Sequence, residues 1–396
     1  EDEIVQSVKD LPFPVTSDVQ EISDFIKENG HKVIFSTYQS SPLIKESQSN
    51  PEVPTFDLVI ADEAHRCVGK VDSEFATVLD DRKIRSKKRL FATATPRTYS
   101  VSLKKSASER GVDVFGMDDE KVFGNEFYVL AFGEAIERGL LTDYQVVIVG
   151  VDNPMIAEYI ERRELVKTES GDITDAESLA SQIGLIKAIK DYDLKRMISF
   201  HSRVKGAETF ASGIKNSIDF LNDDHRANDS IWTDYVSGEM SSHQRRIKLE
   251  QLKELTKGNR GLLSNAKCLS EGVDVPSLDG IAFIDPKSSQ VDIVQAVGRA
   301  IRLSDDKKIG TIVLPVFIED GESAEVSIEA SNFKPIWSVL NALKSHDEVL
   351  SYELDQLRTD IGKKKGLGRD SGRIPKVVFD LPTTIDQTFS HSLKTY

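Results

Sequence analysis

The sequence predicts an α/β protein in which parallel sheets are flanked by helices, and three observations support this fold class. Short apolar segments that suit buried strands alternate along most of the chain with longer segments whose apolar residues recur at helical spacing. The chain has 396 residues, of which 39% are hydrophobic, so it can form two or three domains with separate cores. Polar clusters follow the predicted strands, where ligands bind in open α/β sheets. We therefore expect two α/β domains of substantial size.

The first domain is expected to contain three strands and the second to contain five. Each segment is short, apolar and bounded by polar or turn-forming residues. In the first domain the strands are residues 32–36, 56–60 and 89–92, and in the second they are residues 144–149, 197–200, 261–264, 280–284 and 311–314.

Helices are expected between these strands. Thr174 and Glu177 form a capping box that opens one helix, and Pro335 suits the first turn of another. A short helix is predicted at residues 134–138. The apolar residues that mark the other helices are Leu179, Ile183, Ile186 and Ile189; Phe210, Ile214, Ile218 and Leu221; Leu249, Leu252 and Leu255; and Ile336, Val339, Leu340, Leu343, Leu350, Leu354 and Leu357.

Two shifts in pattern divide the chain. The first, at residues 139–142, separates a predicted helix from a new strand, and the second follows Pro315. We therefore predict one domain at residues 1–139, a second at residues 140–322 and a C-terminal extension at residues 323–396. The extension combines helices, a basic linker at residues 362–373 and a strand at residues 375–381, which we assign to the start of a further element.

The composition argues against some classes of function. A formal net charge of −14 and a pI near 5.1 argue against a general nucleic-acid coat protein, which normally carries a basic face. They do not exclude a translocase that contacts phosphates along one groove. Cys67 and Cys268 are the only cysteines, so neither a disulfide framework nor a zinc cluster is expected. Without an apolar run of membrane-spanning length or a signal-peptide pattern, we expect a cytoplasmic protein with no membrane partner.

Polar residues gather where the predicted strands end. Because the carboxyl ends of parallel strands meet at one edge of a sheet, these side chains are expected to line a site there. The clusters are Ser36 and Thr37, residues 62–65, residues 93–95, residues 199–203, Ser264 and Asn265, and Asp285.

Residues 62–65 form the most informative cluster. Asp62 comes just after an apolar strand, where a carboxylate can hold Mg²⁺ through water, because this ion prefers hard oxygen ligands. Glu63 is a second carboxylate beside it, which can orient and deprotonate an attacking water. The alternative interpretation is a solvated acidic loop after a strand.

Residues 295–302 form a second cluster. A helix here places Arg299 and Arg302 three residues apart on one face. A planar, permanently charged guanidinium suits a transferring phosphate better than an ammonium does. The alternative is an amphipathic helix with solvated arginines, which explains the apolar residues but not the pairing of Gly298 with Arg299.

Residues 269–276 form a third cluster. Gly272 permits a close approach of the backbone to a ligand, and Asp274 could accept a hydrogen bond from a sugar hydroxyl. A β-turn before the next strand explains this segment equally well.

Taken in order, these motifs resemble those of the superfamily 2 helicases and translocases. Residues 33–40 resemble motif Ib, residues 62–65 the DEAH box of motif II, and residues 93–97 motif III. Residues 197–203 resemble motif IV, residues 264–276 motif V and residues 295–302 motif VI. Residues 235–246 resemble the strand-contacting motif between IV and V. Residues 91–97 and 270–274 are most similar to the bacterial group that contains restriction-enzyme motor subunits and phage-defence helicases.

The resemblance implies two RecA-like parallel-sheet lobes, the first of them truncated, followed by a C-terminal helical extension. ATP and Mg²⁺ would lie between the lobes, and nucleic acid would lie across them. Asp62 would coordinate Mg²⁺ through water, and Glu63 would be the catalytic base. Coupling of the nucleotide to the other lobe would involve His65, Thr93 and Thr95.

The remaining implied roles belong mostly to the second lobe. Arg299 and Arg302 would act as arginine fingers, with Gln295 near the γ-phosphate. Gly272 and Asp274 would lie near the ribose. The residues implied to face the nucleic-acid backbone are Thr37, Ser40, Ser202, Arg203 and Ser264.

One departure from the family concerns the phosphate-binding loop. The family needs a P-loop, Gly-x-x-x-x-Gly-Lys-Ser/Thr, upstream of motif Ib, and no such sequence occurs in this chain. The simplest account is that the chain begins after the P-loop, and the rival account is a natural protein that has lost ATPase activity. We expect ATP hydrolysis from the full-length protein but not from this chain alone.

The expected function is an ATP-driven helicase or translocase that acts on duplex DNA in restriction or phage defence. Nuclease or methyltransferase domains or subunits are the expected protein partners. An RNA helicase is an alternative, because the motor motifs do not distinguish the two nucleic acids. A non-catalytic nucleic-acid-binding or assembly module is the alternative from a different class.

Overall fold

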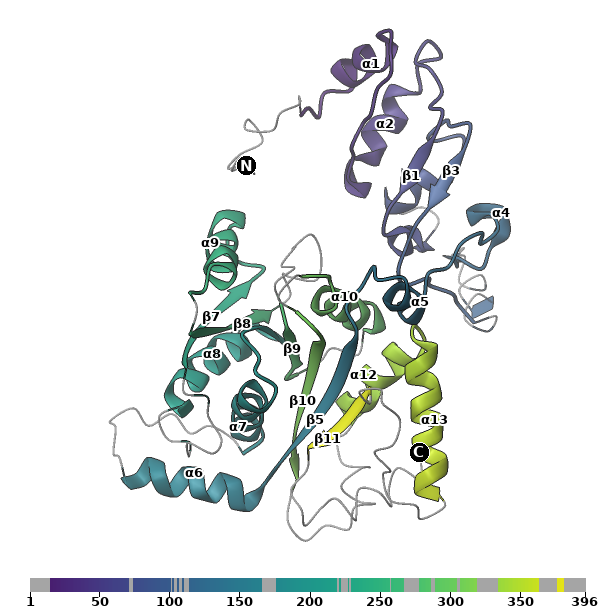
Figure 1. The fold of residues 1–396 in the computed structure, drawn as a ribbon. Helices are drawn as coiled ribbons and strands as arrows, with labels where there is room; N and C mark the ends of the chain where they lie inside the picture. The colour runs from purple at the N-terminus through teal and green to yellow at the C-terminus, as the bar shows by residue number, and fades with distance from the viewer. Residues whose placement is uncertain are drawn as a thin grey trace. The chain divides into compact units, whose positions relative to one another are not determined.

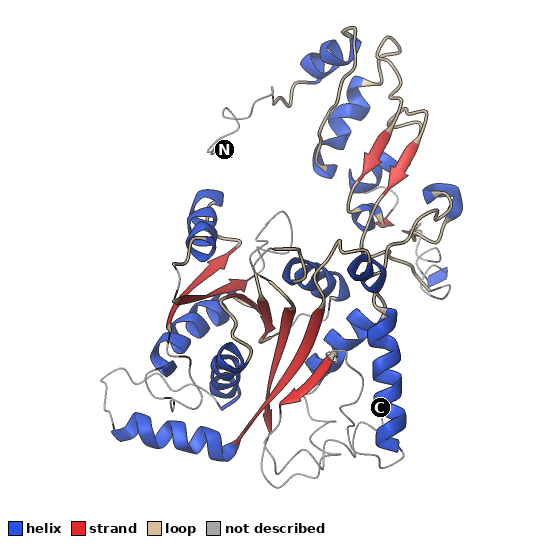
Figure 2. Ribbon diagram, in the orientation of Figure 1, coloured by secondary structure: helices blue, strands red, loops and turns tan. Residues whose placement is uncertain are grey.

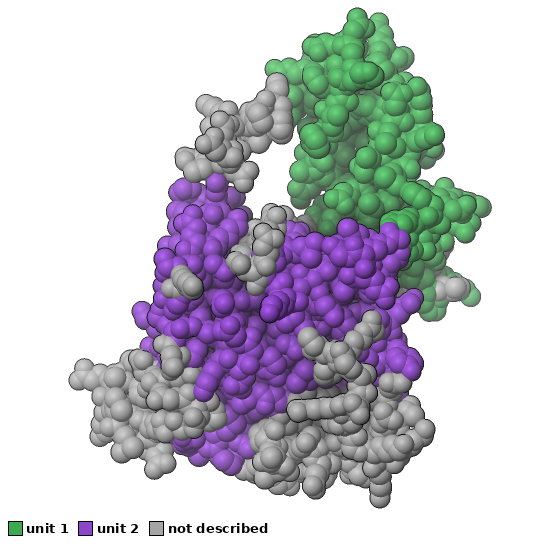
Figure 3. All heavy atoms as spheres, viewed as in Figure 1, with its two compact units in different colours: residues 1–129 green, residues 130–396 purple. Residues whose placement is uncertain are grey.

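The chain forms two compact units, residues 1–129 and residues 130–396, which are described separately below (Figure 3). The sequence placed the first boundary after residue 139. The division lies earlier because helix α5 (Phe132–Glu137) packs into the core of the second unit. The computed structural model describes residues 15–70, 74–100, 102, 105–106, 109, 114–165, 176–218, 221, 227, 229–256, 258–266, 278–285, 289–304, 307–318, 334–362 and 376–380.

The first unit is built around a short parallel pair of strands, β1 (Val59–Ala61) and β3 (Arg89–Phe91) (Figure 1). A second, antiparallel pair joins β2 (Gly69–Lys70) to β4 (Val114–Phe115). A small apolar core of Ala61, Ala64, Cys67, Val78 and Ile84 lies beside the parallel pair. The remaining elements are α1 (Val19–Lys27), η2 (Tyr38–Ser40), α2 (Ser41–Ser47), η3 (Ala64–Cys67), η4 (Glu74–Leu79) and α4 (Glu120–Phe123).

The strand predicted at residues 32–36 is absent, so that prediction was wrong. Residues 31–37 are irregular and make no ladder with any described strand. Val33 and Phe35 are 72% and 80% exposed. Their alternation gave the correct pattern for a strand, but a strand also needs a neighbour to accept its backbone hydrogen bonds.

The second unit contains a seven-stranded, fully parallel sheet in the order β11-β5-β10-β9-β6-β8-β7. Figure 2 draws strands in red and helices in blue. All five strands predicted here are confirmed, most of them with longer bounds. The strands are β5 (Tyr144–Asp152), β6 (Arg196–His201), β7 (Ser230–Ser237), β8 (Asn259–Ala266), β9 (Gly280–Phe283), β10 (Gly310–Ile318) and β11 (Val377–Asp380).

Helices cover both faces of this sheet, as its alternating side chains require. On one face, Val146 and Ile312 pack with α10 (Gln290–Ala300), α12 (Lys334–Lys344) and α13 (Glu348–Gly362). On the other face, Val147 and Val313 pack with α6 (Asn153–Leu165), α7 (Ala176–Asp191) and α8 (Val204–Ile218). Helix α9 (Ser242–Lys253) packs Leu252 near the β7 edge. A parallel sheet buried on both faces explains the nearly continuous apolar runs in β5 and β10.

The predicted helices agree with this arrangement. The apolar face predicted for α7 is buried throughout, and α12 begins one residue before Pro335. Thr174, which is predicted to open α7 as part of a capping box, lies outside the described residues, as does most of the basic linker at 362–373. Among the described residues, no helix combines the length and apolar character needed to cross a lipid bilayer.

Two strands differ from the prediction. The segment at residues 375–381 does form a strand, but β11 pairs in parallel with β5 and completes the second unit's own sheet rather than starting a further element. Lys376 fixes it there by stacking over the ring of Tyr144, 4.1 Å from its centroid. Strand β7 was not predicted, because as an edge strand it is only partly buried and its pattern is mixed.

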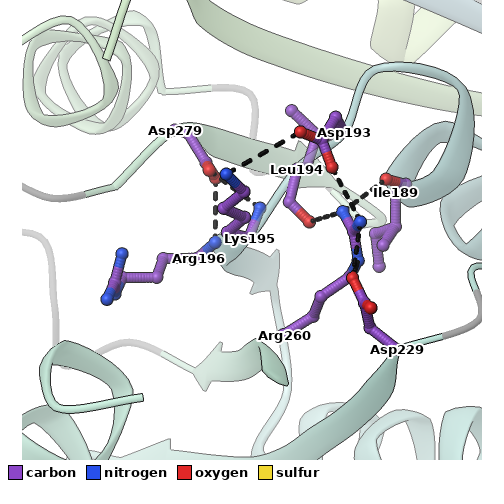
Figure 4. Close-up of polar contacts among 8 residues, drawn as sticks. All are labelled: Ile189, Asp193, Leu194, Lys195, Arg196, Asp229, Arg260 and Asp279. Atoms are coloured by element: carbon purple, nitrogen blue, oxygen red, sulfur yellow. Dashed lines mark hydrogen bonds and ion pairs between the residues drawn. The ribbon is translucent and has the colours of Figure 1, made fainter. Parts of the chain in front are cut away.

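Arg260 organises the amino ends of the central strands (Figure 4). Its guanidinium contacts Asp229 at 2.8 Å and Asp193 at 2.7 Å, and it donates to the carbonyls of Ile189 and Leu194 at 3.3 and 2.9 Å. The arginine is 8% exposed, so these partners replace the water it loses. The network therefore joins the end of α7 to the start of β8.

Asp279 makes the corresponding connection to β6. Its carboxylate accepts hydrogen bonds from the amides of Lys195 and Arg196 at 2.8 and 2.9 Å (Figure 4). Burial raises the pKa of this carboxyl, and the amide donors oppose that shift. The amino ends of these strands are thus held by buried polar contacts.

We predict that Arg260→Met lowers the free energy of unfolding of the second unit by about 3 kcal/mol, because it leaves the buried carbonyls of Ile189 and Leu194 without their donor. Urea unfolding followed by tryptophan fluorescence reports on this unit alone, since both tryptophans, Trp232 and Trp337, lie in it. Lys253→Met is the control, because its pair with Glu250 on α9 is exposed and is expected to contribute less than about 1 kcal/mol. Equal midpoints for the two variants would contradict the prediction.

Candidate functional site

An acidic turn follows β1 directly. The amide of Glu63 donates to Asp62 Oδ1 at 2.9 Å, and the hydroxyl of Tyr38 donates to the carbonyl of Asp62. Glu63 has φ 50° and ψ 44°, a left-handed conformation that is costly for a residue with a side chain. The turn leaves the Asp62 carboxylate exposed and that of Glu63 partly buried behind it.

His65 connects this turn to the end of β3. The side chain is 3% exposed, and its Nδ1 lies 2.9 Å from Thr93 Oγ1 and 3.3 Å from Thr95 Oγ1. The same nitrogen lies 3.3 Å from Glu63 Oε2. Thr93 and Thr95, which are predicted to act with His65, therefore share one ring nitrogen with the Glu63 carboxylate, and a change in any of these contacts changes the surroundings of that carboxylate.

The pairing of β1 with β3 produces this arrangement. Ala64 donates its amide to the carbonyl of Ala92 at 2.9 Å, and Ala92 donates to Ala61 at 3.0 Å. The amide of Thr95 donates to Thr93 Oγ1 at 3.1 Å, which fixes the turn after β3. Parallel pairing thus brings the two predicted motifs to one edge.

Tyr38 is a residue that the sequence interpretation did not single out. Its ring lies over Phe75, with centroids 6.0 Å apart, and its hydroxyl reaches both the Asp62 carbonyl and the buried Cys67. Burial raises the pKa of the Cys67 thiol to about 11, and the Tyr38 contact opposes that shift. The position of Tyr38 within residues 33–40 was the feature of the sequence that could have indicated this supporting role.

The acidic turn fits the way in which Mg²⁺ binds at phosphate-transfer sites. Within the described ranges, no group of three or more His, Cys, Asp or Glu side chains forms a closed metal site. Mg²⁺ usually keeps several waters and takes one or two carboxylates together with substrate phosphates. The exposed carboxylate of Asp62 matches that requirement.

Thr37 and Ser40 lie close together in a turn. Thr37 caps η2, where its Oγ1 accepts from the amide of Ser40 at 3.3 Å and donates to Ser40 Oγ at 3.1 Å. Thr37 is exposed. The predicted pair is therefore brought together by local capping rather than by the end of a strand.

In the second unit, polar side chains meet at the carboxyl ends of β6, β8 and β9. Ser199 Oγ lies 3.0 Å from both Ser264 Oγ and His201 Nε2. Ser202 donates to the carboxylate of Asp285. Arg203 is exposed where the chain enters α8.

Ser264 differs from the expectation that it faces nucleic acid. Its side chain is fully buried and accepts from Ser199, because β6 and β8 are paired at this position. His201 is 6% exposed, and burial lowers its pKa to about 4, although Asp285 opposes the shift. The imidazole is neutral at neutral pH and acts as part of the packed sheet edge.

Helix α10 carries the predicted arginine motif. Ser289 caps it by accepting from the amide of Asp292 at 3.4 Å. Gln295 and Arg299 lie on the helix, and Arg299 is 8% exposed. A side chain at Gly298 would meet no atom within 4 Å, so this glycine leaves open space beside Arg299.

The prediction that Arg299 and Arg302 share one helix face was wrong. Helix α10 ends at Ala300, and Arg302 lies in the turn that follows. The amide of Thr142 donates to the carbonyl of Ile301 at 2.8 Å, just after the end of the helix. Gly272 and Asp274, the predicted ribose-binding residues, lie outside the described residues.

Two segments of the chain match protein-family models. Residues 4–98 match the family model described as type III restriction enzyme, res subunit, and residues 183–304 match the helicase conserved C-terminal domain. The African swine fever virus protein "Probable helicase A859L" is 27% identical over 327 residues, which cover 81% of this chain and 32% of that protein.

Two solved structures are similar over almost the whole chain. The DNA-bound "ATP-dependent Type ISP restriction-modification enzyme LlaBIII" has a TM-score of 0.71 and 29% identity, covering 91% of this chain and 24% of that chain. A nuclease-deletion mutant of the Type ISP enzyme LlaGI, in complex with a DNA substrate mimic, has a TM-score of 0.55 and 26% identity, covering 93% of this chain and 23% of that chain.

The chain thus spans about a third of the viral relative and about a quarter of these restriction-modification enzymes. The residues that match the first family model lie in the first compact unit, and those that match the second lie in the second unit. Together, these similarities show that the chain belongs to the superfamily 2 helicases and has their RecA-like α/β fold.

Proposed function

We propose that this chain is the motor portion of an ATP-dependent helicase or translocase that acts on duplex DNA in restriction or phage defence, and that ATP is hydrolysed by the full-length protein. The observation that carries the proposal is the contact of His65 Nδ1 with Glu63, Thr93 and Thr95, because it joins a candidate base to the next motif. The DNA-bound Type ISP enzymes support DNA as the nucleic acid. Nuclease or methyltransferase domains or subunits are the proposed partners.

The first unit supplies the groups that act on water and metal. ATP provides the phosphoryl group that is transferred to water, and Mg²⁺ neutralises charge on its oxygens. The exposed carboxylate of Asp62 would hold this ion through water. Glu63 orients the attacking water and accepts its proton, while His65 holds the Glu63 carboxylate in place.

The second unit supplies positive charge. Arg299 and Arg302 stabilise the charge that develops on the transferring phosphate, and Gln295 contributes a polar contact there. Gly272 and Asp274 are proposed to contact the ribose. Because the arginines act on the transition state, their removal is expected to lower kcat more than it weakens nucleotide binding.

We predict that Glu63→Gln in the full-length protein retains binding of Mg·ATP but lowers kcat by about 10²–10⁴-fold, because it removes the base while keeping the shape of the side chain. Steady-state ATPase assays with saturating duplex DNA measure this loss. Glu52→Gln is the matched control, since Glu52 is exposed and pairs only across the surface with Lys27. Turnover of Glu63→Gln at the level of Glu52→Gln would remove Glu63 from the proposed role.

We predict that DNA binding weakens steeply with salt despite the net charge of −14, because contacts to phosphates release counterions. Arg203→Ala should reduce the slope of log K against log salt by about one. Lys215→Ala, an exposed change farther along α8, should leave the slope unchanged. Binding by fluorescence anisotropy between about 50 and 200 mM salt measures both slopes. Equal slopes for wild type and Arg203→Ala would count against a phosphate contact at this residue.

We predict that duplex DNA stimulates the ATPase of the full-length protein more than duplex RNA of the same sequence does. The Type ISP structures that resemble this chain contain DNA or a DNA mimic. The measurement is kcat with each duplex at saturating concentration. Stronger stimulation by RNA would favour an RNA helicase instead.

A further inference from the structure

The end of α10 and the turn after it have three successive carbonyls bound by other parts of the second unit. The last carbonyls of a helix have no partner within the helix and need other donors. The ammonium of Lys307 donates to the carbonyl of Ala300 at 3.0 Å. Thr142 donates its amide to Ile301 at 2.8 Å and its hydroxyl to the carbonyl of Arg302 at 3.3 Å. Three successive carbonyls, ending with that of Arg302 itself, are therefore bound.

The groups that bind this turn belong to the body of the sheet. Lys307 also donates to the carbonyl of Leu278, which precedes β9, at 3.0 Å. Thr142 precedes β5 and is 7% exposed. Gly310, at the start of β10, lies so close that a Cβ there would approach the Ala300 carbonyl oxygen to 2.7 Å. The turn is thus attached to the starts of three central strands.

We propose that Lys307 and Thr142 are positioning residues that hold the turn after α10, so that Arg302 and the neighbouring Arg299 are presented to the transferring phosphate in a fixed geometry. This inference rests on the proposed role of these two arginines. Neither positioning residue touches the phosphate. They act by removing the freedom of the last helical turn, which otherwise frays because its carbonyls would depend on water.

A lysine suits this position for two physical reasons. Its compact ammonium has three donors, so one group can serve the carbonyls of both Ala300 and Leu278. A positive charge near the last carbonyls also interacts favourably with the negative end of the helix dipole. The effect on catalysis is preorganisation, since a displacement of about 1 Å in a reacting group can lower the rate by about 10²-fold.

The charge of Lys307 gives the inference a pH-dependent consequence. Burial lowers its pKa to about 8, the charge of Arg302 acts in the same direction, and the carboxylate of Asp279 opposes the shift. As the pH rises through about 8, the ammonium loses its proton and its charge interaction with the helix end. The turn then loosens, and kcat falls on the alkaline side.

The test is the pH dependence of kcat and KM for ATP in the full-length protein with saturating duplex DNA. Lys307→Gln should lower kcat by between about 10-fold and 100-fold at neutral pH with little change in KM. Lys307→Arg keeps the charge and the donors, so it should restore kcat and remove the decline above about pH 8. Lys308→Gln, at the exposed neighbouring lysine, is the control.

Thr142→Val provides a second variant of similar shape, which removes the hydroxyl donor but keeps the backbone amide. It should lower kcat in the same direction and by less. If Lys307→Gln does not fold, this variant and the pH profile of Lys307→Arg still test the inference. A kcat for Thr142→Val and an alkaline profile for Lys307→Arg that both equal those of the wild type would overturn it.

Arg299→Ala and Arg302→Ala separate this inference from the proposed function. If both arginine variants keep the kcat of the wild type, the proposed role of the arginines fails and Lys307 has nothing to position. If the arginine variants lose activity while Lys307→Gln behaves like Lys308→Gln, only the positioning inference is overturned. Loss of kcat in all three variants, with rescue by Lys307→Arg, supports both.

Discussion

The seven strands of the second unit's sheet are parallel, so all of them begin at one edge of the sheet and end at the opposite edge. Most of the organisation of this unit depends on that constraint. Helices cover both faces of the sheet. Buried polar groups at the starting edge, centred on Arg260 and Asp279, hold the strands in register. Short hydroxyl and imidazole side chains occupy the opposite edge, where Ser199 and His201 meet. The two ends of the strands therefore carry different polar groups.

In the first unit, the described parallel strands β1 and β3 also end side by side. Their pairing brings the acidic turn at Asp62 and Glu63 beside the threonines after β3, and a single buried histidine joins the two. The left-handed backbone at Glu63 shows that the turn is shaped by more than local preference. The surroundings of a carboxylate held in this way change with small displacements of the neighbouring motif, as the proposed coupling of chemistry to movement requires.

Much of this could be predicted from sequence, because parallel strands buried on both faces leave clear apolar runs and polar residues at their ends. What could not be predicted depended on tertiary partners. Residues 32–36 have the pattern of a strand but no neighbour among the described residues, and β7 has a neighbour but a mixed pattern. Spacing alone placed Arg302 on a helix that ends at Ala300, and its carbonyl is bound instead by Thr142, 160 residues away along the chain. Burial of Ser264 likewise depends on its partner strand.

The environment of Cys67 has a practical consequence for labelling. The thiol is buried, and its pKa of about 11 keeps it protonated at neutral pH, so it reacts slowly with maleimides and other thiol-directed reagents. It is also the only cysteine in residues 1–129. A cysteine introduced at an exposed position of the first unit would therefore carry a fluorophore selectively within that unit, without replacing the native residue that packs against Tyr38.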